Sequence, residues 1–221
     1  DENRGGFILN QDLPAARLET RKAPRKFDFS AAPRTMAAEP EVLYSVNNGV
    51  ALCTLNRPKN LNGWTATMQE LYFDSLDEAE RDPSVRVIVV TGAGRAFCSG
   101  ADLGPAGGVD FWAARPMTHP TSVSKPIIAA INGACAGLGM QQALVTDIRF
   151  AAAGAKFTTA FSRRGLIAEL GTSWLLPHTI GRGAAMEILL SGRTFLAEEA
   201  LQMGLVSRVF PAETLLKETL A

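Results

Sequence analysis

Alternating apolar and polar residues begin the regular part of the chain. Apolar side chains occupy every second position over 42–46 and again over 50–54, and Asn48-Gly49 lies between the two stretches. Side chains of a strand point alternately to its two faces, and Asn-Gly is typical of type I′ hairpin turns. The pattern therefore predicts a β-hairpin over 42–54.

Longer periods and continuous apolar runs predict the other elements. Over 65–81 the apolar residues recur three and four positions apart, as on one face of a helix, and Thr67 and Glu70 have capping-box spacing. Runs that are apolar throughout indicate strands buried on both faces. We predict such strands at 85–90 and 127–131, shorter strands at 148–151 and 206–210, and further helices at 138–145, 173–180, 184–190 and 197–203.

Two regions follow from this organisation. Strands and helices alternate over 41–221 without a detectable repeat, which predicts one α/β domain. Residues 1–40 contain several prolines and no sustained apolar period, so we predict an arm that is poorly ordered by itself. A transit peptide is the alternative interpretation, although acidic residues such as Asp12 and Glu19 are unusual in one.

Composition narrows the classes of function. The chain has 221 residues, and its 22 basic residues balance 22 acidic ones, whereas nucleic-acid-binding proteins usually carry a basic excess. No apolar run approaches the length of a membrane helix. Cys53, Cys98 and Cys135 are far apart, and the chain has only 2 histidines. We expect no nucleic-acid partner, no membrane span, no metal site, and buried thiols in a reducing, cytoplasmic location.

Two loops rich in small residues follow predicted strands, at 97–103 and 132–139. Small residues let a ligand approach the backbone, and the first N–H groups of a helix lack intrahelical partners. Two such loops side by side would direct two N–H groups at one oxygen, as in an oxyanion hole. The alternative interpretation is that the small residues only allow tight packing between each strand and the helix after it. Neither loop has the glycine spacing of a dinucleotide-binding fingerprint.

Glu169 is the candidate acid/base. It lies in the apolar stretch 165–172, which glycines interrupt. A carboxylate among apolar neighbours is poorly hydrated, which favours proton uptake and suits a general base. A solvated glutamate at a helix start, stabilised by the helix dipole, is the alternative interpretation.

Together these segments resemble the crotonase superfamily, the enoyl-CoA hydratase/isomerase family. The resemblance runs from about 42 to 210 and rests on 55–58 with Asn62, on 87–92, 98–103 and 125–139, on Asp147, and on 197–204. It implies an α/β crotonase (ClpP/crotonase-like) fold, which is a repeated ββα spiral with two near-perpendicular sheets and a helical trimerisation region. It also implies a homotrimer or a dimer of trimers.

The resemblance further implies an acyl-CoA substrate, with coenzyme A arriving as part of it and no other cofactor. By motif position, the amides that hold the thioester oxygen belong to Ser99 and Leu138. Arg57 and Lys59 are candidates for the CoA phosphates or solvated turn residues, and Asp102 also fits a helix cap. The implied substrate-binding residues are Lys59, Leu61, Ser99, Gly100, Ala101, Asp102, Leu103, Gly137, Leu138, Gln141 and Phe161.

Departures from the hydratase pattern concern the general bases. Where hydratases have two glutamates, this chain has Gln141 and, by our alignment, Phe161. Glu169 is placed instead like the single base of peroxisomal-type Δ3,Δ2-enoyl-CoA isomerases, which implies that it moves a proton from C2 to C4 of a 3-enoyl-CoA. Two alternatives remain open: a hydratase that uses Glu169 with a water held by Gln141, and a non-catalytic acyl-CoA-binding protein.

Two segments are short for the resembled family. The stretch after Leu103 contains Phe111, Trp112 and Met117, which would form an apolar lid over the acyl chain or an ordinary surface loop. The chain also stops before the family's last helices would be complete. We therefore expect a domain that lacks some of its C-terminal helices.

Overall fold

A computed structural model of the chain describes residues 39–104 and 115–221. The predicted arm over 1–40 lies outside these residues except for Glu39 and Pro40. The predicted lid residues Phe111 and Trp112 also lie outside them, whereas Met117, the third, is 3% exposed and packs in the hydrophobic core rather than in a lid.

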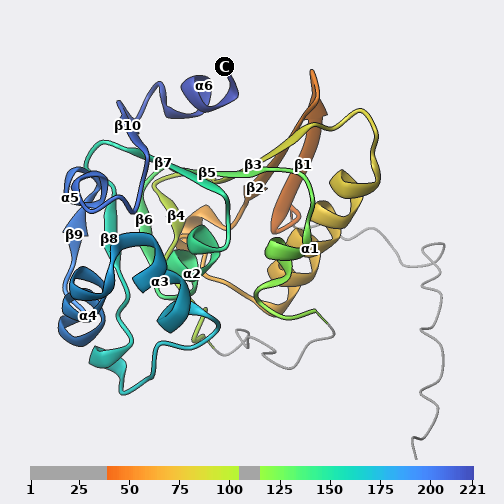
Figure 1. The fold of residues 1–221 in the computed structure, drawn as a ribbon. Coiled ribbons are helices and arrows are strands. Elements are labelled where there is room, and N and C mark those ends of the chain that lie inside the picture. The colour runs from red at the N-terminus through yellow and green to blue at the C-terminus, as the bar shows by residue number, and fades with distance from the viewer. Residues whose placement is uncertain (1–38, 105–114) are drawn as a thin grey trace, which may run out of the picture. The chain divides into compact units, whose positions relative to one another are not determined.

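A six-stranded sheet forms the larger layer (Figure 1). β1 and β2 pair antiparallel, whereas the other neighbours pair in parallel. Asn48 and Gly49 have φ angles of 51° and 83°, as a type I′ turn requires, so the predicted hairpin is confirmed. In spatial order the strands are β1 (Val42–Asn47), β2 (Val50–Leu55), β3 (Val87–Gly92), β5 (Ile127–Ile131), β7 (Ile148–Ala152) and β10 (Arg208–Phe210).

A second sheet consists of short strands that the hydrophobic pattern did not predict. Strands of two or three residues are too short to show an alternation. β4, β6 and β8 each follow a long strand of the first sheet, which is the repeated unit that the resemblance implied. The strands are β4 (Ala96–Cys98), β6 (Ala134–Ala136), β8 (Lys156–Thr158) and β9 (Phe195–Leu196).

The predicted helices are confirmed to within a few residues, but the capping box is not. Thr65, rather than Thr67, caps the first helix, because its side chain accepts a hydrogen bond from the Met68 N–H at 2.9 Å. The chain also has a short final helix that we did not predict. The helices are α1 (Ala66–Arg81), α2 (Leu138–Leu144), α3 (Thr172–Ile180), α4 (Arg182–Ser191), α5 (Ala197–Gln202) and α6 (Leu215–Leu220).

Buried side chains lie between the sheets and helices. The apolar face of α1 is buried, as predicted, and consecutive residues of β3 are buried on both faces of the sheet. All three cysteines are buried and free, and burial raises the pKa of Cys53 and of Cys98 to about 12. These thiols therefore carry almost no thiolate near neutral pH. No helix in the described part of the chain is long and apolar enough to cross a membrane.

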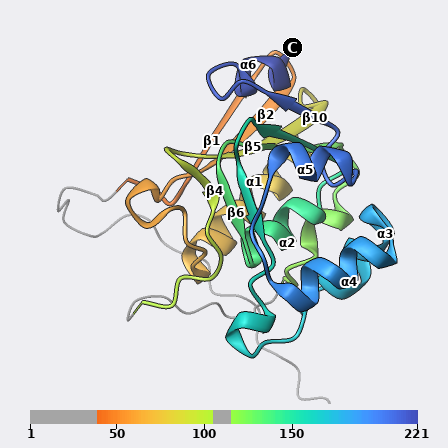
Figure 2. The same cartoon turned by 90° about the vertical axis from the view of Figure 1, so that its left-hand side faces the viewer.

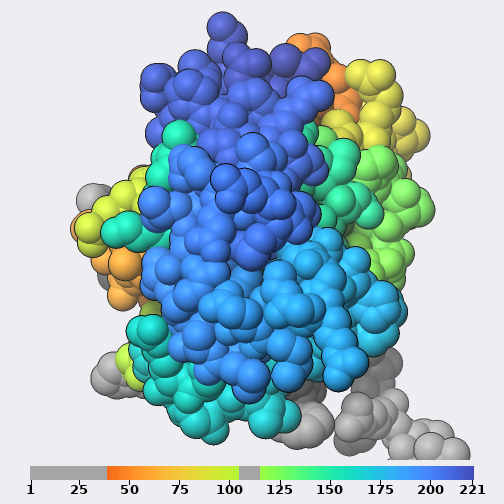
Figure 3. Space-filling view, turned by 60° about the vertical axis from the view of Figure 1, so that its left-hand side comes forward, coloured from red at the N-terminus to blue at the C-terminus, as the bar shows by residue number. Residues whose placement is uncertain are grey.

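α3 and α4 lie side by side (Figure 2) and form much of the face in Figure 3. The two helices carry large exposed apolar side chains, among them Trp174 at 62% exposure and Leu190 at 70%. A trimerisation region in this part of the chain stays a prediction.

Asn62 connects the loop after β2 to the turn between β3 and β4. Its fully buried side chain donates to the carbonyls of Ala93 (2.9 Å) and Ala96 (2.7 Å) and accepts from the Arg57 N–H (2.8 Å). We expect Asn62→Ala to lower the free energy of unfolding by about 2 kcal/mol or more, because buried polar groups lose their partners. Urea denaturation measures this, with the exposed Asn60→Ala as control. Equal stability of both variants would contradict the prediction.

Candidate active site

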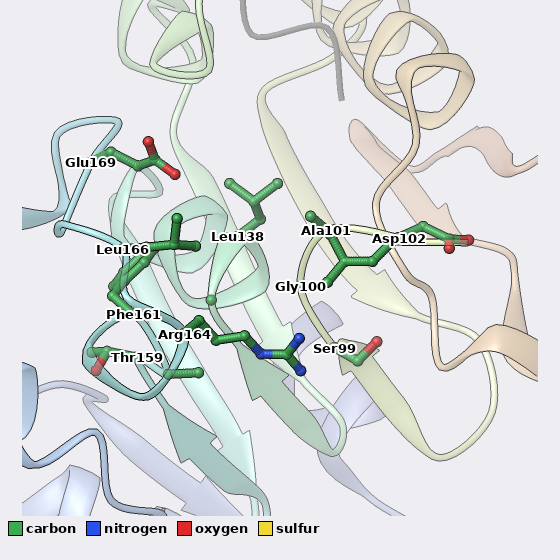
Figure 4. A pocket seen from close by; sticks show the side chains of 13 residues that line it. Ser99, Gly100, Ala101, Asp102, Leu138, Thr159, Phe161, Arg164, Leu166 and Glu169 are labelled. Atoms are coloured by element: carbon green, nitrogen blue, oxygen red, sulfur yellow. The ribbon is translucent and has the colours of Figure 1, made fainter. Parts of the chain in front are cut away.

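A pocket of about 420 Å³ opens where the two small-residue loops meet the segment that contains Glu169 (Figure 4). Its walls are mostly apolar. The residues that line it are Ser99, Gly100, Ala101, Asp102, Leu103, Gly137, Leu138, Thr159, Ala160, Phe161, Arg164, Leu166 and Glu169.

Parallel pairing of β4 with β6 brings the two loops together. The loop after β4 then lies against the first residues of α2. A methyl group at Gly139 would lie 2.2 Å from the Cys98 carbonyl oxygen, so this glycine is required for the close approach. Both interpretations of the small residues therefore hold: they pack tightly, and they border a pocket.

Ser99 is wrong as the first amide donor. Its N–H donates to the carbonyl of Leu61 at 3.1 Å and is therefore already paired. Ala101, which also lines the pocket, is the candidate donor in its place. The residues on either side of Ala101 both form hydrogen bonds with the backbone of Trp64. The Trp64 N–H donates to the Gly100 carbonyl (2.8 Å), and the Asp102 N–H donates to the Trp64 carbonyl (2.9 Å). In a parallel bridge of this kind, the Ala101 N–H points away from Trp64.

Leu138 is the candidate for the second amide donor. It is the first residue of α2, after Gly137 with a φ of 50°. Within 39–104 and 115–221, neither the Leu138 N–H nor the Ala101 N–H has a hydrogen-bond acceptor. Figure 4 shows Ala101 and Leu138 next to one another, and the residues before them, Gly100 and Gly137, are in close contact. Two unpaired N–H groups that border one pocket can hold a carbonyl oxygen as negative charge develops on it.

Glu169 enters the pocket from the loop before α3. Its side chain is half-buried and points toward Leu138 (Figure 4). The next residue, Leu170, has a φ of 56°, a left-handed conformation that few residues other than glycine adopt. Its carbonyl accepts a hydrogen bond from the Gln141 side chain at 3.0 Å. This contact from α2 anchors the loop that carries Glu169.

Gln141 does not line the pocket, which contradicts its predicted contact with substrate or a water. Its side chain is fully buried. The amide nitrogen donates to Leu170, and the amide oxygen accepts from Gln142 at 2.7 Å. The side chain is therefore engaged within the protein and positions the loop of Glu169 instead.

Asp102 lines the pocket but is held by other groups. Its carboxylate accepts from the Gly104 N–H (2.9 Å) and pairs with Arg57 (2.7 Å), and these two contacts hold its pKa below the usual range. The contact with Gly104 closes a turn, and a helix capped by Asp102 stays a prediction, because residues 105–114 lie outside the described ones. Arg57 also pairs with Glu41 at 3.2 Å, so it is not the freely solvated turn residue of the alternative interpretation, and its contact with a CoA phosphate stays a prediction.

Two other predicted substrate contacts lie outside this pocket. Lys59 is exposed in the short 3-10 helix η1 (Pro58–Asn60). Leu61 lines a separate hollow beside Arg95 and Asn132. Their contacts with the CoA moiety stay predictions.

Sequence reasoning missed Arg164, along with Thr159, Ala160 and Leu166. Arg164 ends the 3-10 helix η3 (Ser162–Arg164), which is too short to show a period. The one available signal was the pair of arginines before Gly165, close to Phe161. Phe161 itself lines the pocket and is 6% exposed.

Comparison with known proteins finds both isomerases and hydratases. A profile described as Enoyl-CoA hydratase/isomerase matches residues 45–221. The 1,2-epoxyphenylacetyl-CoA isomerase of Escherichia coli K12 is 40% identical in an alignment of 186 residues that covers 79% of this chain and 71% of that protein. The probable enoyl-CoA hydratase EchA12 of Mycobacterium tuberculosis H37Rv is 42% identical over 185 residues, but the chain covers only 64% of that protein.

Solved structures give the same picture. The enoyl-CoA hydratase EchA12_1 from Mycobacterium marinum has a TM-score of 0.73 and 49% identity, over 82% of this chain and 86% of that one. A monofunctional enoyl-CoA isomerase from M. smegmatis has a TM-score of 0.71 and 40% identity, over 82% of each chain. Similarity to proteins of both names does not select the reaction.

Proposed function

The chain belongs to the enoyl-CoA hydratase/isomerase family, and from this premise we propose that it moves the double bond of a 3-enoyl-CoA with Glu169 as its single acid/base. The pocket supports this proposal because the side chain of Glu169 points into it toward Leu138, one of the two unpaired amides.

The observation that carries the proposal is the number of carboxylates available for proton transfer. Among the described residues that line the pocket, Asp102 and Glu169 are the acidic ones. The ion pair with Arg57 keeps Asp102 ionised and held in place, so it is a poor proton carrier. Phe161 presents only carbon, and Gln141 lies behind the pocket. One working carboxylate suits a proton shuttle better than a two-base addition of water.

The proposed mechanism follows from these positions. The N–H groups of Ala101 and Leu138 hold the thioester oxygen while Glu169 removes a proton from C2. The electrons of that C–H bond form a dienolate whose negative charge rests on this oxygen. The same carboxyl group then returns the proton to C4, and the double bond moves from C3–C4 to C2–C3. Only a proton moves, so the step consumes no oxidant or reductant. Apolar walls reduce competition from water.

Product analysis with a deuterium-labelled substrate tests the reaction. We expect 3-hexenoyl-CoA carrying deuterium at C2 to give a 2-enoyl-CoA with part of the label at C4, because one carboxyl group both removes and returns it. Mass spectrometry and NMR locate the label. A product heavier by one water, from this substrate or from trans-2-hexenoyl-CoA, would show a hydratase instead. Binding without any turnover would show a non-catalytic acyl-CoA-binding protein.

The proposal also includes an oligomeric state and a cellular compartment for the protein. Exposed apolar side chains on α3 and α4, such as Trp174, suit contact between copies in a homotrimer or a dimer of trimers. The buried free thiols suit a reducing compartment such as the cytoplasm.

A further inference from the structure

Arg164 brings a positive charge into a pocket whose walls are mostly apolar. It is the only basic residue among the described residues that line the pocket. Figure 4 shows its side chain extending below Leu138, with the guanidinium directed toward the loop of Ser99. Neither the proton shuttle nor the amide pair uses this charge.

No ion pair within the described part of the chain includes Arg164. The pairs found there involve Arg57, Arg81, Arg115, His119 and Arg193. The two carboxylates of the pocket do not pair with it either, since Asp102 pairs with Arg57. Arg164 is exposed to solvent where it borders the pocket, and no carboxylate of the described residues neutralises it, so its guanidinium is available to an anionic ligand.

The backbone around Arg164 is held by a defined turn. The Arg164 N–H and the Leu166 N–H both donate to the Phe161 carbonyl, at 2.9 and 3.0 Å. Gly165 ends the turn with a φ of 67°. The neighbouring Arg163 lies outside the pocket, and its Nε donates to the Ser191 carbonyl at the end of α4 (3.4 Å). Adjacent arginines of one turn therefore have separate surroundings, and Arg164 alone lines the pocket.

We propose that Arg164 binds an anionic oxygen group of the acyl-CoA ligand. The planar guanidinium can donate two parallel hydrogen bonds to a carboxylate or a phosphate. Such a group belongs either to the acyl chain, as a carboxylate, or to the coenzyme A moiety, as a phosphate. The inference rests on the proposed function only in taking an acyl-CoA as the ligand.

Binding of saturated thioesters tests this independently of turnover. The probes are hexanoyl-CoA, adipoyl-CoA, which adds a terminal carboxylate, and hexanoyl-pantetheine, which lacks the phosphates. Calorimetric titration gives Kd for the wild type, Arg164→Met and Arg164→Lys. The control is Arg163→Met, which removes a charge of the same turn outside the pocket. We expect this control to bind all three probes like the wild type.

Two results support the proposal and identify the source of the anion. If the group is an acyl carboxylate, Arg164→Met raises Kd about tenfold or more for adipoyl-CoA relative to hexanoyl-CoA. If it is a phosphate, the variant raises Kd for both CoA thioesters by a similar factor relative to hexanoyl-pantetheine. In either case we expect Arg164→Lys to retain part of the affinity, since it keeps the charge but not the fork of donors.

Other results overturn it. An unchanged Kd for all three probes would show that Arg164 is a solvated surface residue. An equal rise for all three, including hexanoyl-pantetheine, would show a role in pocket shape rather than in charge recognition. The expected Arg164 pattern without isomerisation of 3-hexenoyl-CoA would reject the proposed function and keep this inference. Isomerisation of 3-hexenoyl-CoA together with an unchanged Kd for all three probes in Arg164→Met would keep the proposed function and reject this inference.

Discussion

Glu169→Gln lowers kcat for isomerisation of a 3-enoyl-CoA by about 10²–10⁴-fold, the range that a single general acid/base contributes. Glutamine has nearly the size of glutamate and keeps the contacts of the loop, but its amide cannot take a proton from C2. No second carboxylate of the described pocket substitutes for it, because Asp102 is paired with Arg57. We expect Kd for the saturated hexanoyl-CoA to change little, since the proton transfer is lost and the binding surface stays.

A matched control separates catalysis from general damage. Glu213 is exposed and lies outside the pocket, so Glu213→Gln removes one carboxylate without touching the reaction. Steady-state kinetics should show wild-type kcat for this variant. Retention of more than about a tenth of kcat in Glu169→Gln would contradict the assignment of Glu169 as the single base.

Leu138→Pro removes the second amide donor, and we expect kcat to fall about 10²–10³-fold, as for loss of one oxyanion-hole donor. Proline has no N–H but fits the first position of a helix, where that N–H has no intrahelical acceptor. Leu138 occupies this position in α2. The change therefore deletes the proposed donor without breaking a hydrogen bond of the helix.

Leu138→Ala is the matched variant for this prediction. It shortens the side chain and keeps the N–H, so kcat should fall far less than in Leu138→Pro. Proline restricts the backbone of the residue before it, which here is Gly137 with a φ of 50°. Thermal unfolding therefore has to be measured for both variants, to establish that each is folded. An equal fall of kcat in two folded variants would assign the effect to the side chain and reject the amide as a donor.

Elements with a long repeat were predictable from the chain, and short ones were not. The periods over 65–81 and 85–90 indicated α1 and β3 because several turns, or several consecutive buried residues, repeat the same signal. β4, β6, β8 and β9 have no such signal, and their pairing depends on residues far apart in the sequence. The resemblance to a known family, rather than any local pattern, predicted a second sheet.

The site shows the same division. Glu169 was recognisable as a carboxylate in an apolar stretch, and the two loops were recognisable by their small residues. Gln141 was recognisable only as a departure from the hydratase pattern. Gln141 lies in α2, and its side chain reaches the Leu170 carbonyl because α2 packs near the loop before α3. Only the folded chain shows this contact. Arg164 could not be distinguished from Arg163 by sequence, because the turn decides which one lines the pocket.

By itself, the sequence determined the order of the main strands and helices, the two loops, and the acidic residue that reaches the pocket. Only the tertiary structure decided which amide is free. Ser99 and Ala101 are two positions apart and equally small, but the Ser99 N–H bonds to Leu61, whereas the pairing with Trp64 turns the Ala101 N–H away. The physical reason is that a backbone N–H has no side-chain signature. Its direction and its partner are set by strands that meet only in the folded chain.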